Sequence, residues 1–362
     1  MPSRSDRVTT AAPATAGSVV VTGAAGALGQ RVCALAAADP AVPHVVALDR
    51  RPLRRLPSGI ERHQVDLATA DLKALMEGAS AVVHLAEGDG PPKGGDVSRP
   101  TGEAALAQRV LDAAGSAGVT HAVVLSTALA YGAWAGNPVP LTEDAPLRPN
   151  PGVALAAEKA EVERVVAEWR ADHPGVTAAV LRPTIVVSAS GNGWLARALT
   201  RSGPLAVADE EPPAQFLDVD DLAAAVDLAR RARLDGPRNV APDGWISGET
   251  VRALTGGVPK VHLPERVALR LAGFRWRWGM APTPPELLPY TVHPWVIAND
   301  RLRADGWVPE SSNEEAYVAS HRAGPWATLS PRRRQEIALG AAGATIVGSA
   351  AGLVALLRRG RR

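Results

Sequence analysis

Three glycines at three-residue spacing are the first residues of the chain whose pattern suggests chemistry. Gly23, Gly26 and Gly29 follow the apolar run SVVVT (18–22) and open a helical stretch at 27–38. Glycines permit a tight turn and let backbone N–H groups approach a phosphate, whose charge is stabilised at a helix N-terminus. An ordinary structural strand–turn–helix unit is the alternative. We expect this turn to bind the pyrophosphate of a dinucleotide through Gly23, Ala25, Gly26, Leu28 and Gly29.

An acidic residue at the end of the second expected strand bears on which dinucleotide would bind. Asp49 ends the run HVVALD (44–49) and lies 26 residues after Gly23. A carboxylate at this place accepts hydrogen bonds from a ribose 2′-hydroxyl and repels a 2′-phosphate. The sequence therefore favours NAD over NADP, although Arg50 and Arg51 partly offset that repulsion.

The elements that must position these residues alternate along the first two-thirds of the chain. Compact apolar runs are typical of parallel strands covered on both faces, and alanine-rich helical stretches lie between them. We predict an α/β fold, a Rossmann-type doubly wound parallel sheet with a small C-terminal substrate lobe and a C-terminal hydrophobic helix. The expected strands are 18–22, 44–49, 62–66, 81–86, 121–126 and 177–182, and the expected helices are 27–38, 70–77, 103–117 and 153–171.

The 362 residues divide into four expected segments. Residues 1–17 are small and polar and form a flexible leader, and residues 18–257 form the dinucleotide-binding domain. The part of that domain after about residue 190 also contributes to the substrate lobe, which otherwise spans 258–330. A basic-flanked hydrophobic helix closes the chain at 331–362.

Further short motifs follow the glycine turn in a fixed order. They are Asp66-Leu67, His84-Leu85-Ala86, Leu125-Ser126-Thr127, Tyr131-Gly132, Lys159-x-x-x-Glu163, Leu181-Arg182-Pro183 and Asp218-Val219-Asp220-Asp221. With the turn and Asp49, this order resembles the extended short-chain dehydrogenase/reductase family, which includes the NAD-dependent sugar-nucleotide epimerases and dehydratases. The resemblance implies NAD as cofactor, with the adenine beside Asp66 and Leu67 and the nicotinamide ribose beside His84, Leu85 and Ala86.

The resemblance also implies a catalytic tyrosine, which this chain lacks. In the family a tyrosine exchanges a proton with a carbinol, a lysine one helical turn later binds the ribose, and a serine or threonine bonds to the reacting oxygen. Lys159 matches the lysine, and Thr127, with Ser126 as its substitute, matches the hydroxyl. Leu155 stands where the tyrosine is expected, and Glu103 stands where the family often has asparagine. A leucine cannot supply general acid/base catalysis, which contributes about 100- to 10,000-fold in rate.

Three interpretations of the missing acid/base remain open. Tyr131 reaches the nicotinamide from its own loop, or another group such as Glu87, Glu103 or His84 replaces the tyrosine. In both cases the protein is an atypical NAD-dependent oxidoreductase or epimerase acting on a carbinol or carbonyl of a nucleotide-sugar or lipid-like substrate. In the third, NAD is bound without turnover and the protein is a sensor or scaffold at a membrane.

The C-terminal end of the sequence predicts a membrane contact. No charged residue occurs from 337 to 357, whereas arginines stand at 332–334 and in the closing RRGRR. Twenty-one residues of helix span about 30 Å, close to the thickness of a bilayer core. We expect a tail anchor that places the domain on the cytoplasmic face of a membrane; a helix docked on a cytoplasmic domain is the alternative. A helix or homo-oligomer partner could pack on the smooth face formed by Gly340, Ala344, Gly348 and Gly352.

A second candidate for contact with lipid or anions lies at FRWRWGM (274–280). Arginines that alternate with aromatics can lie at lipid headgroups, and Arg275 and Arg277 could instead hold an anionic substrate. The alternative is a tryptophan-filled core beneath a lid with solvated arginines.

Composition excludes several classes of function. The formal charge is +2, but residues 331–362 hold seven arginines and one glutamate, so the rest of the chain is acidic and nucleic acid is not an expected partner. Cys33 is the only cysteine, which excludes an intrachain disulfide and a thiolate zinc cluster. We therefore expect a small-molecule substrate and no metal.

Overall fold

The computed structural model describes residues 17–321, apart from 89, 91–94, 201–204, 207–211, 255–260, 263–264 and 281–282. The expected leader, except Gly17, and the expected hydrophobic helix at 331–362 lie outside these residues. Within the described ranges, no helix combines the length and apolarity that crossing a bilayer requires.

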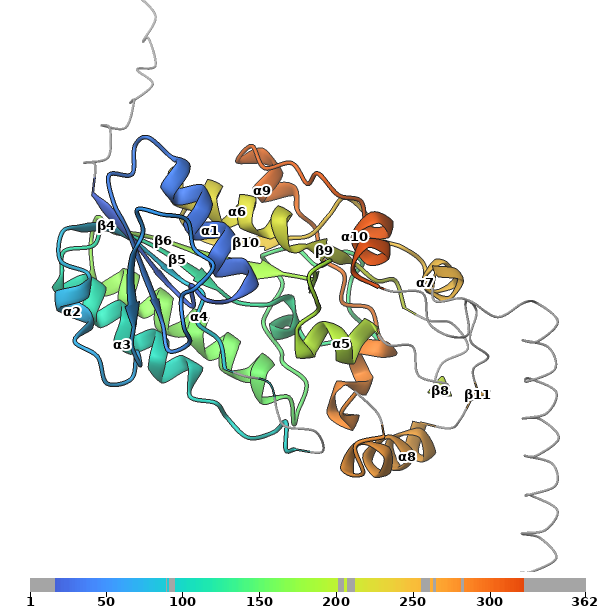
Figure 1. Cartoon of the computed structure of the whole chain (residues 1–362). Helices are drawn as coiled ribbons and strands as arrows, with labels where there is room; N and C mark the ends of the chain where they lie inside the picture. The colour runs from blue at the N-terminus through green and yellow to red at the C-terminus, as the bar shows by residue number, and fades with distance from the viewer. Residues whose placement is uncertain are drawn as a thin grey trace, which may run out of the picture.

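Seven parallel strands form the central sheet (Figure 1). Its order is β10-β6-β5-β4-β1-β2-β3, so β1 pairs with β2 on one side and with β4 on the other. The predicted doubly wound sheet is confirmed, and its switch point lies at the carboxyl end of β1, where such sheets bind ligands. The strands are β1 (Ser18–Thr22), β2 (Val45–Asp49), β3 (Glu61–Gln64), β4 (Ala79–His84), β5 (His121–Leu125), β6 (Thr177–Pro183) and β10 (Gly236–Val240).

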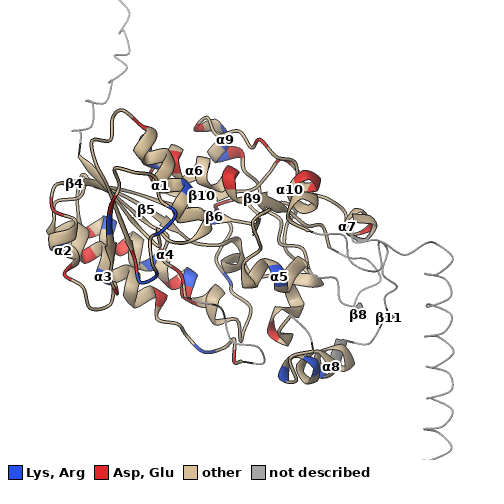
Figure 2. Cartoon of the chain, in the orientation of Figure 1, with Lys and Arg blue, Asp and Glu red and all other residues tan. Residues whose placement is uncertain are grey.

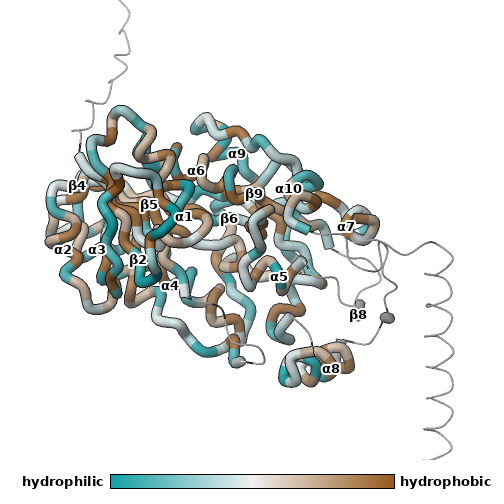
Figure 3. Tube along the Cα trace, in the orientation of Figure 1, coloured by the Kyte–Doolittle hydropathy of each residue, from teal (hydrophilic) through white to brown (hydrophobic). Residues whose placement is uncertain are grey.

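Helices cover both faces because successive side chains of each buried strand point to opposite sides. Val19 and Val21 of β1 pack in one apolar cluster with α1 (Ala27–Ala38) and α6 (Val219–Arg231). Val20 packs in the opposite cluster with the helices of the other face, and Figure 3 shows the apolar colour concentrated on the strands between the two layers. That face carries α2 (Leu72–Leu75), α3 (Glu103–Ser116) and α4 (Ala154–Asp172).

A third apolar cluster forms the lobe beyond the carboxyl ends of the strands. It contains Tyr131, Phe216, Tyr290 and Tyr317, which come from distant parts of the chain. The lobe therefore draws on segments before and after residue 258 (Figure 1). Its elements are η1 (Ala128–Tyr131), β7 (Ile185–Val187), α5 (Trp194–Thr200), β8 (Leu205–Ala206), β9 (Phe216–Asp218), α7 (Gly248–Leu254), β11 (Val261–His262), α8 (Glu265–Arg277), η2 (Pro285–Thr291), α9 (Asp300–Ala304) and α10 (Asn313–Ser320).

A buried ion pair links α4 to β6 and to the lobe. Arg182 Nη2 donates to Glu163 Oε2 at 2.6 Å, and Arg182 Nε lies 3.0 Å from both carboxylate oxygens. Ser126 Oγ donates to Glu163 Oε1 at 2.5 Å. On the other side, Arg182 Nη1 donates at 2.6 Å to Tyr131 Oη, which donates to Asn239 Oδ1 at 2.8 Å. All five residues are buried, so the charges are paired where water cannot screen them.

We predict that Glu163→Gln lowers the free energy of unfolding by about 3–5 kcal/mol, because Arg182 then remains buried without a counter-charge. Urea unfolding followed by circular dichroism measures the change. The matched control is Glu161→Gln on the same helix, whose exposed pair with Arg164 contributes little. An equal change in the free energy of unfolding in the two variants would show that the buried pair does not hold α4 against β6.

Candidate active site

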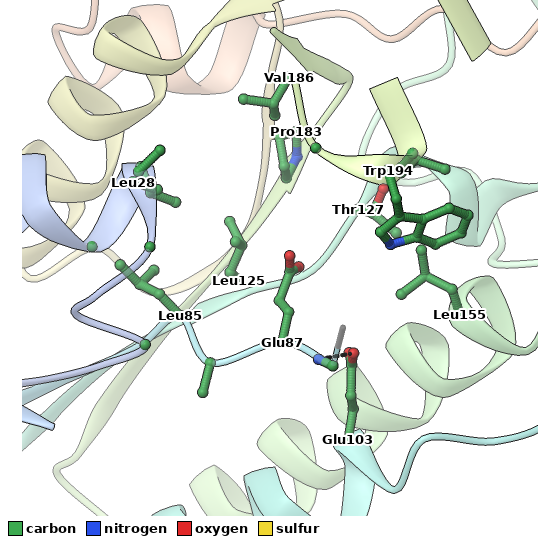
Figure 4. A pocket seen from close by; sticks show the side chains of 18 of the residues that line it. Leu28, Leu85, Glu87, Glu103, Leu125, Thr127, Leu155, Pro183, Val186 and Trp194 are labelled. Atoms are coloured by element: carbon green, nitrogen blue, oxygen red, sulfur yellow. Dashed lines mark hydrogen bonds between the residues drawn. The ribbon is translucent and has the colours of Figure 1, made fainter. Parts of the chain in front are cut away.

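A cavity of about 590 Å³ opens at the carboxyl ends of the parallel strands (Figure 4). Its volume lies within the range of cofactor and substrate pockets, about 300–1,000 Å³. The walls come from the glycine turn after β1, the ends of β2, β4 and β5, the first turns of α3 and α4, and the segment from β6 to α5. The position matches the crevice that the sheet order predicts.

The glycine turn is pressed between β4 and α1. Gly23 has a φ of +72°, and a Cβ on it would lie 2.7 Å from the backbone N of Ala86. A Cβ on Gly29 would lie 2.2 Å from the carbonyl oxygen of Gly23. No side chain caps the N-terminus of α1, and residues 26–29 line the cavity. The turn thus offers uncapped N–H groups at a positive helix end, which suits a pyrophosphate.

Asp49 forms part of the cavity wall and is held ionised. It is 4% exposed, and its carboxylate accepts from the N–H of Ala25 at 2.9 Å and from the N–H of Arg51 at 2.8 Å. The Arg51 guanidinium lies 3.2 Å from both oxygens. Burial opposes ionisation of Asp49, but the hydrogen bonds from Arg51 and Ala25 outweigh it and hold the carboxyl pKa below its usual range.

The other predicted cofactor residues reach the cavity with one exception. Ala25 does not line it, because its N–H is turned to Asp49. Arg50, a predicted cofactor residue, lines the cavity. The ion pair between Arg51 and Asp49 was not predicted. The lining includes Gly23, Gly26, Leu28, Gly29, Asp49, Arg50, Asp66, Leu67, Leu85, Ala86 and Lys159.

Lys159 brings a buried positive charge to the cavity. Its Nζ lies 2.9 Å from Glu87 Oε1 and 3.1 Å from Glu103 Oε2, and it donates to the carbonyl oxygen of Leu125 at 3.1 Å. Burial alone would lower the pKa of this amine, but Glu87 and Glu103 outweigh burial and raise the pKa. Lys159 is therefore an ammonium that donates to Leu125 and is paired with the two carboxylates.

Glu103 is positioned by a residue that the sequence analysis missed. Glu103 begins α3, and its Oε1 accepts from the N–H of Gly88 at 2.8 Å, shown dashed in Figure 4. Glu158 of α4 caps α3 by accepting from the N–H groups of Thr101 at 2.8 Å, Gly102 at 2.6 Å and Glu103 at 3.1 Å. Glu158 and Thr101 are 57 residues apart, so no local pattern could have predicted this cap.

Thr127, Leu155 and Trp194 lie together at one end of the cavity, and Leu28 and Leu85 lie toward the other (Figure 4). Ser126 also lines the cavity, but its hydroxyl donates to Glu163. Thr127 is therefore the better candidate to hold a reacting oxygen. Leu155 presents an apolar side chain beside it, as the sequence implies.

Two of the acid/base candidates lie outside the cavity lining. Tyr131 is 1% exposed, and burial raises its pKa to about 12 while its hydroxyl is engaged by Arg182 and Asn239. His84 Nδ1 lies 2.8 Å from Thr22 Oγ1, and burial, aided by the charge of Lys159, lowers the pKa of His84 to about 3. The candidates that the structure brings into the cavity are Glu87, half exposed, and Glu103, buried.

Comparisons with known proteins agree with this geometry. The model of the NAD dependent epimerase/dehydratase family matches residues 19–241. No curated protein matches the chain. Solved structures share the fold at identities of 17–23%. The UDP-N-acetylglucosamine 4-epimerase from Methanobrevibacter ruminantium M1 is 18% identical over 84% of this chain and 96% of that one, with a TM-score of 0.63.

Two further structures are similar in fold and were solved with NAD. The UDP-glucose 4-epimerase from Thermus thermophilus is 23% identical over 83% of this chain and 97% of that one, with a TM-score of 0.62. The UDP-glucuronic acid 4-epimerase from Bacillus cereus, in complex with UDP-glucuronic acid and NAD, is 17% identical over 84% and 97%, with a TM-score of 0.61. At these identities the likeness shows the fold.

We predict that acid destabilises the protein partly through His84. Its folded-state pKa of about 3 lies below the ordinary 6.5, so the unfolded chain binds more protons between these values. The stability that the neutral, buried His84 contributes is present above pH 6.5 and is lost as pH falls. The loss in free energy of unfolding is about 2–3 kcal/mol at pH 4.5. In His84→Asn, unfolding free energy measured from pH 7.5 to 4.5 should show a shallower slope. His293→Asn, which changes a partly exposed histidine, is the control. An unchanged slope in His84→Asn would contradict the prediction.

Proposed function

We propose a function from the premise that the chain belongs to the NAD dependent epimerase/dehydratase family, within the extended short-chain dehydrogenase/reductase superfamily. The protein binds NAD and oxidises or reduces a carbinol or carbonyl carbon. The substrate is a nucleotide-sugar or a lipid-like molecule. The observation that carries the proposal is the buried Lys159 ammonium in a cavity that begins at an uncapped glycine turn.

The residues of the cavity fit NAD. The turn at Gly23 and the N-terminus of α1 suit the pyrophosphate, and Asp49 suits the hydroxyls of the adenosine ribose. Lys159 suits the second ribose. When bound, NAD supplies a hydride acceptor or donor. Asp49 also favours NAD over NADP, because its carboxylate is ionised and would repel a 2′-phosphate.

Glu87 is our candidate for the acid/base that replaces the tyrosine. Its carboxylate lies in the cavity and contacts Lys159 at 2.9 Å, while 45% of its side chain is exposed. Thr127 would hold the reacting oxygen, and Glu87 would take the hydroxyl proton during oxidation and return it during reduction. Glu103 is a weaker candidate, because its two oxygens already face Gly88 and Lys159.

A second candidate function is NAD binding without turnover, in a sensor or scaffold. The observation that favours it is the pairing of Lys159, which donates to Leu125 and forms ion pairs with Glu87 and Glu103. A ribose hydroxyl that binds Lys159 competes with these groups, and of the two carboxylates Glu87 is the exposed one. With Leu155 at the place of the tyrosine, the resting site then has a cofactor lysine but no family acid/base.

We predict that calorimetry with the full-length chain detects binding of NAD, and of NADP more weakly. Asp49→Ala should weaken NAD binding about 10- to 100-fold, because a charge-assisted hydrogen bond contributes about 1.5–3 kcal/mol. Asp112→Ala, an exposed change on the far part of α3, is the matched control. Absence of heat with both NAD and NADH would remove the basis of the proposal.

We predict that Glu87→Gln lowers turnover about 100- to 10,000-fold, because the amide cannot exchange a proton. NAD affinity should be kept or increased, because Lys159 loses a competing counter-charge. UDP-glucose, UDP-N-acetylglucosamine and long-chain alcohols serve as substrates. Oxidation is followed by NADH absorbance and epimerisation by chromatography. Glu77→Gln, an exposed change, is the control.

The same assays separate the two functions. Turnover by the parent chain that Glu87→Gln removes supports the enzyme. An inert parent that binds NAD and gains turnover in Leu155→Tyr supports the sensor, because the phenol then restores the family's acid/base at its expected place.

A further inference from the structure

Helix α8 presents an apolar face that no described element covers. Of the large apolar side chains that the structure describes as exposed, six lie between 267 and 280, with Trp278 at 68% and Phe274 at 56%. Val267, Leu271, Phe274 and Trp278 follow helical i, i+4, i+7 and i+11 spacing, so they share one face. The rings of Phe274 and Trp278 lie 6.1 Å apart. We call these four residues the α8 stripe.

The opposite face of α8 fixes the helix to the lobe. Ala268 is 1% exposed, and Trp276 Nε1 donates to the carbonyl oxygen of Gly95 at 2.9 Å. A Cβ on Gly273 would lie 3.9 Å from Pro285, so η2 packs closely there. Helix α8 lies at the edge of the molecule, on the side away from α1 (Figure 1). The α8 stripe is therefore held in a fixed outward orientation.

Positive charge surrounds the α8 stripe. Helix α8 contains four arginines and one acidic residue, Glu265, which is its first residue. Arg270 and Arg277 are exposed, and Figure 2 shows basic residues along α8. Aromatic and aliphatic side chains on one face with arginines beside them are the pattern of a helix that lies in the plane of a membrane interface.

We infer that the α8 stripe docks on an anionic lipid surface, with Phe274 and Trp278 in the headgroup layer and Arg270 and Arg277 against lipid phosphates. Tryptophan is the residue type most characteristic of that layer. A second copy of this chain fits less well, because an isologous contact would bring arginines of both copies together.

The sequence outside the described residues supports the same occupant. Residues 337–357 carry no charge and are flanked by arginines on both sides. An uncharged run of this length between basic residues is typical of a helix that contacts a bilayer, so the sequence itself favours a lipid surface near this chain. The inference is independent of the proposed function, since it uses no residue of the cavity.

The test reports on α8 separately from the C-terminal end of the full-length chain. Met280→Cys places a thiol beside the α8 stripe for an environment-sensitive dye, and the only native cysteine, Cys33, is fully buried. Vesicles of equimolar phosphatidylcholine and phosphatidylglycerol should shift the dye emission to the blue, and brominated lipids should quench it. The same dye on Leu35→Cys, in α1, should not respond.

Matched variants define what the dye response depends on. Phe274→Ser with Trp278→Ser, or Arg270→Glu with Arg277→Glu, should abolish it. Trp245→Ser, which removes another exposed tryptophan, should leave it intact. No response at position 280 in the presence of anionic vesicles would overturn the inference. A blue shift that grows with protein concentration without vesicles would overturn it in favour of a second copy.

Discussion

The ammonium of Lys159 must be neutralised inside the protein, and much of the cavity is arranged around this requirement. A buried charge costs several kcal/mol unless it is paired and hydrogen-bonded. With Leu155 one turn earlier, no phenol stands beside it, and Glu87 and Glu103 provide the counter-charge. Glu103 can do so because Glu158 caps the helix that Glu103 begins. The charge of Lys159 is thus balanced by one carboxylate from a loop and one from the start of α3.

A second buried ion pair, Glu163–Arg182, determines which hydroxyl groups near the cavity are already hydrogen-bonded within the protein. The Glu163–Arg182 pair engages the hydroxyls of Ser126 and Tyr131, which sequence motifs alone would leave available to a substrate. These hydroxyls connect the sheet to the lobe and are not free to react. Thr127, the neighbour of Ser126, remains at the end of the cavity. The pair therefore determines which hydroxyl of the motif can contact a substrate.

The sequence predicts best what depends on local patterns. The helix expected at 27–38 is α1 as observed, and the turn before it lies in the crevice, because glycine spacing and strand apolarity are read from adjacent residues. The helix expected at 70–77 shortens to Leu72–Leu75. The seventh strand, β10, was not predicted, because Gly236, Pro237 and Arg238 give it no apolar run and its pairing with β6 is long-range. The cap by Glu158 and the burial of Tyr131 likewise depend on distant partners.

Helix α8 is attached to one of the segments that line the cavity. Trp276 binds Gly95, and Gly95 lies on the connection from β4 to α3 that also carries Glu87. A lipid surface that contacts the α8 stripe would therefore lie against α8, and α8 is hydrogen-bonded to the β4–α3 connection that carries Glu87. Leu155, Val186 and Trp194 line the cavity, and apolar substrate surface, whether an alkyl chain or the C–H face of a sugar, gains about 25 cal/mol for each Å² that it buries there. The apolar wall therefore suits an apolar part of the substrate in either of the two proposed classes.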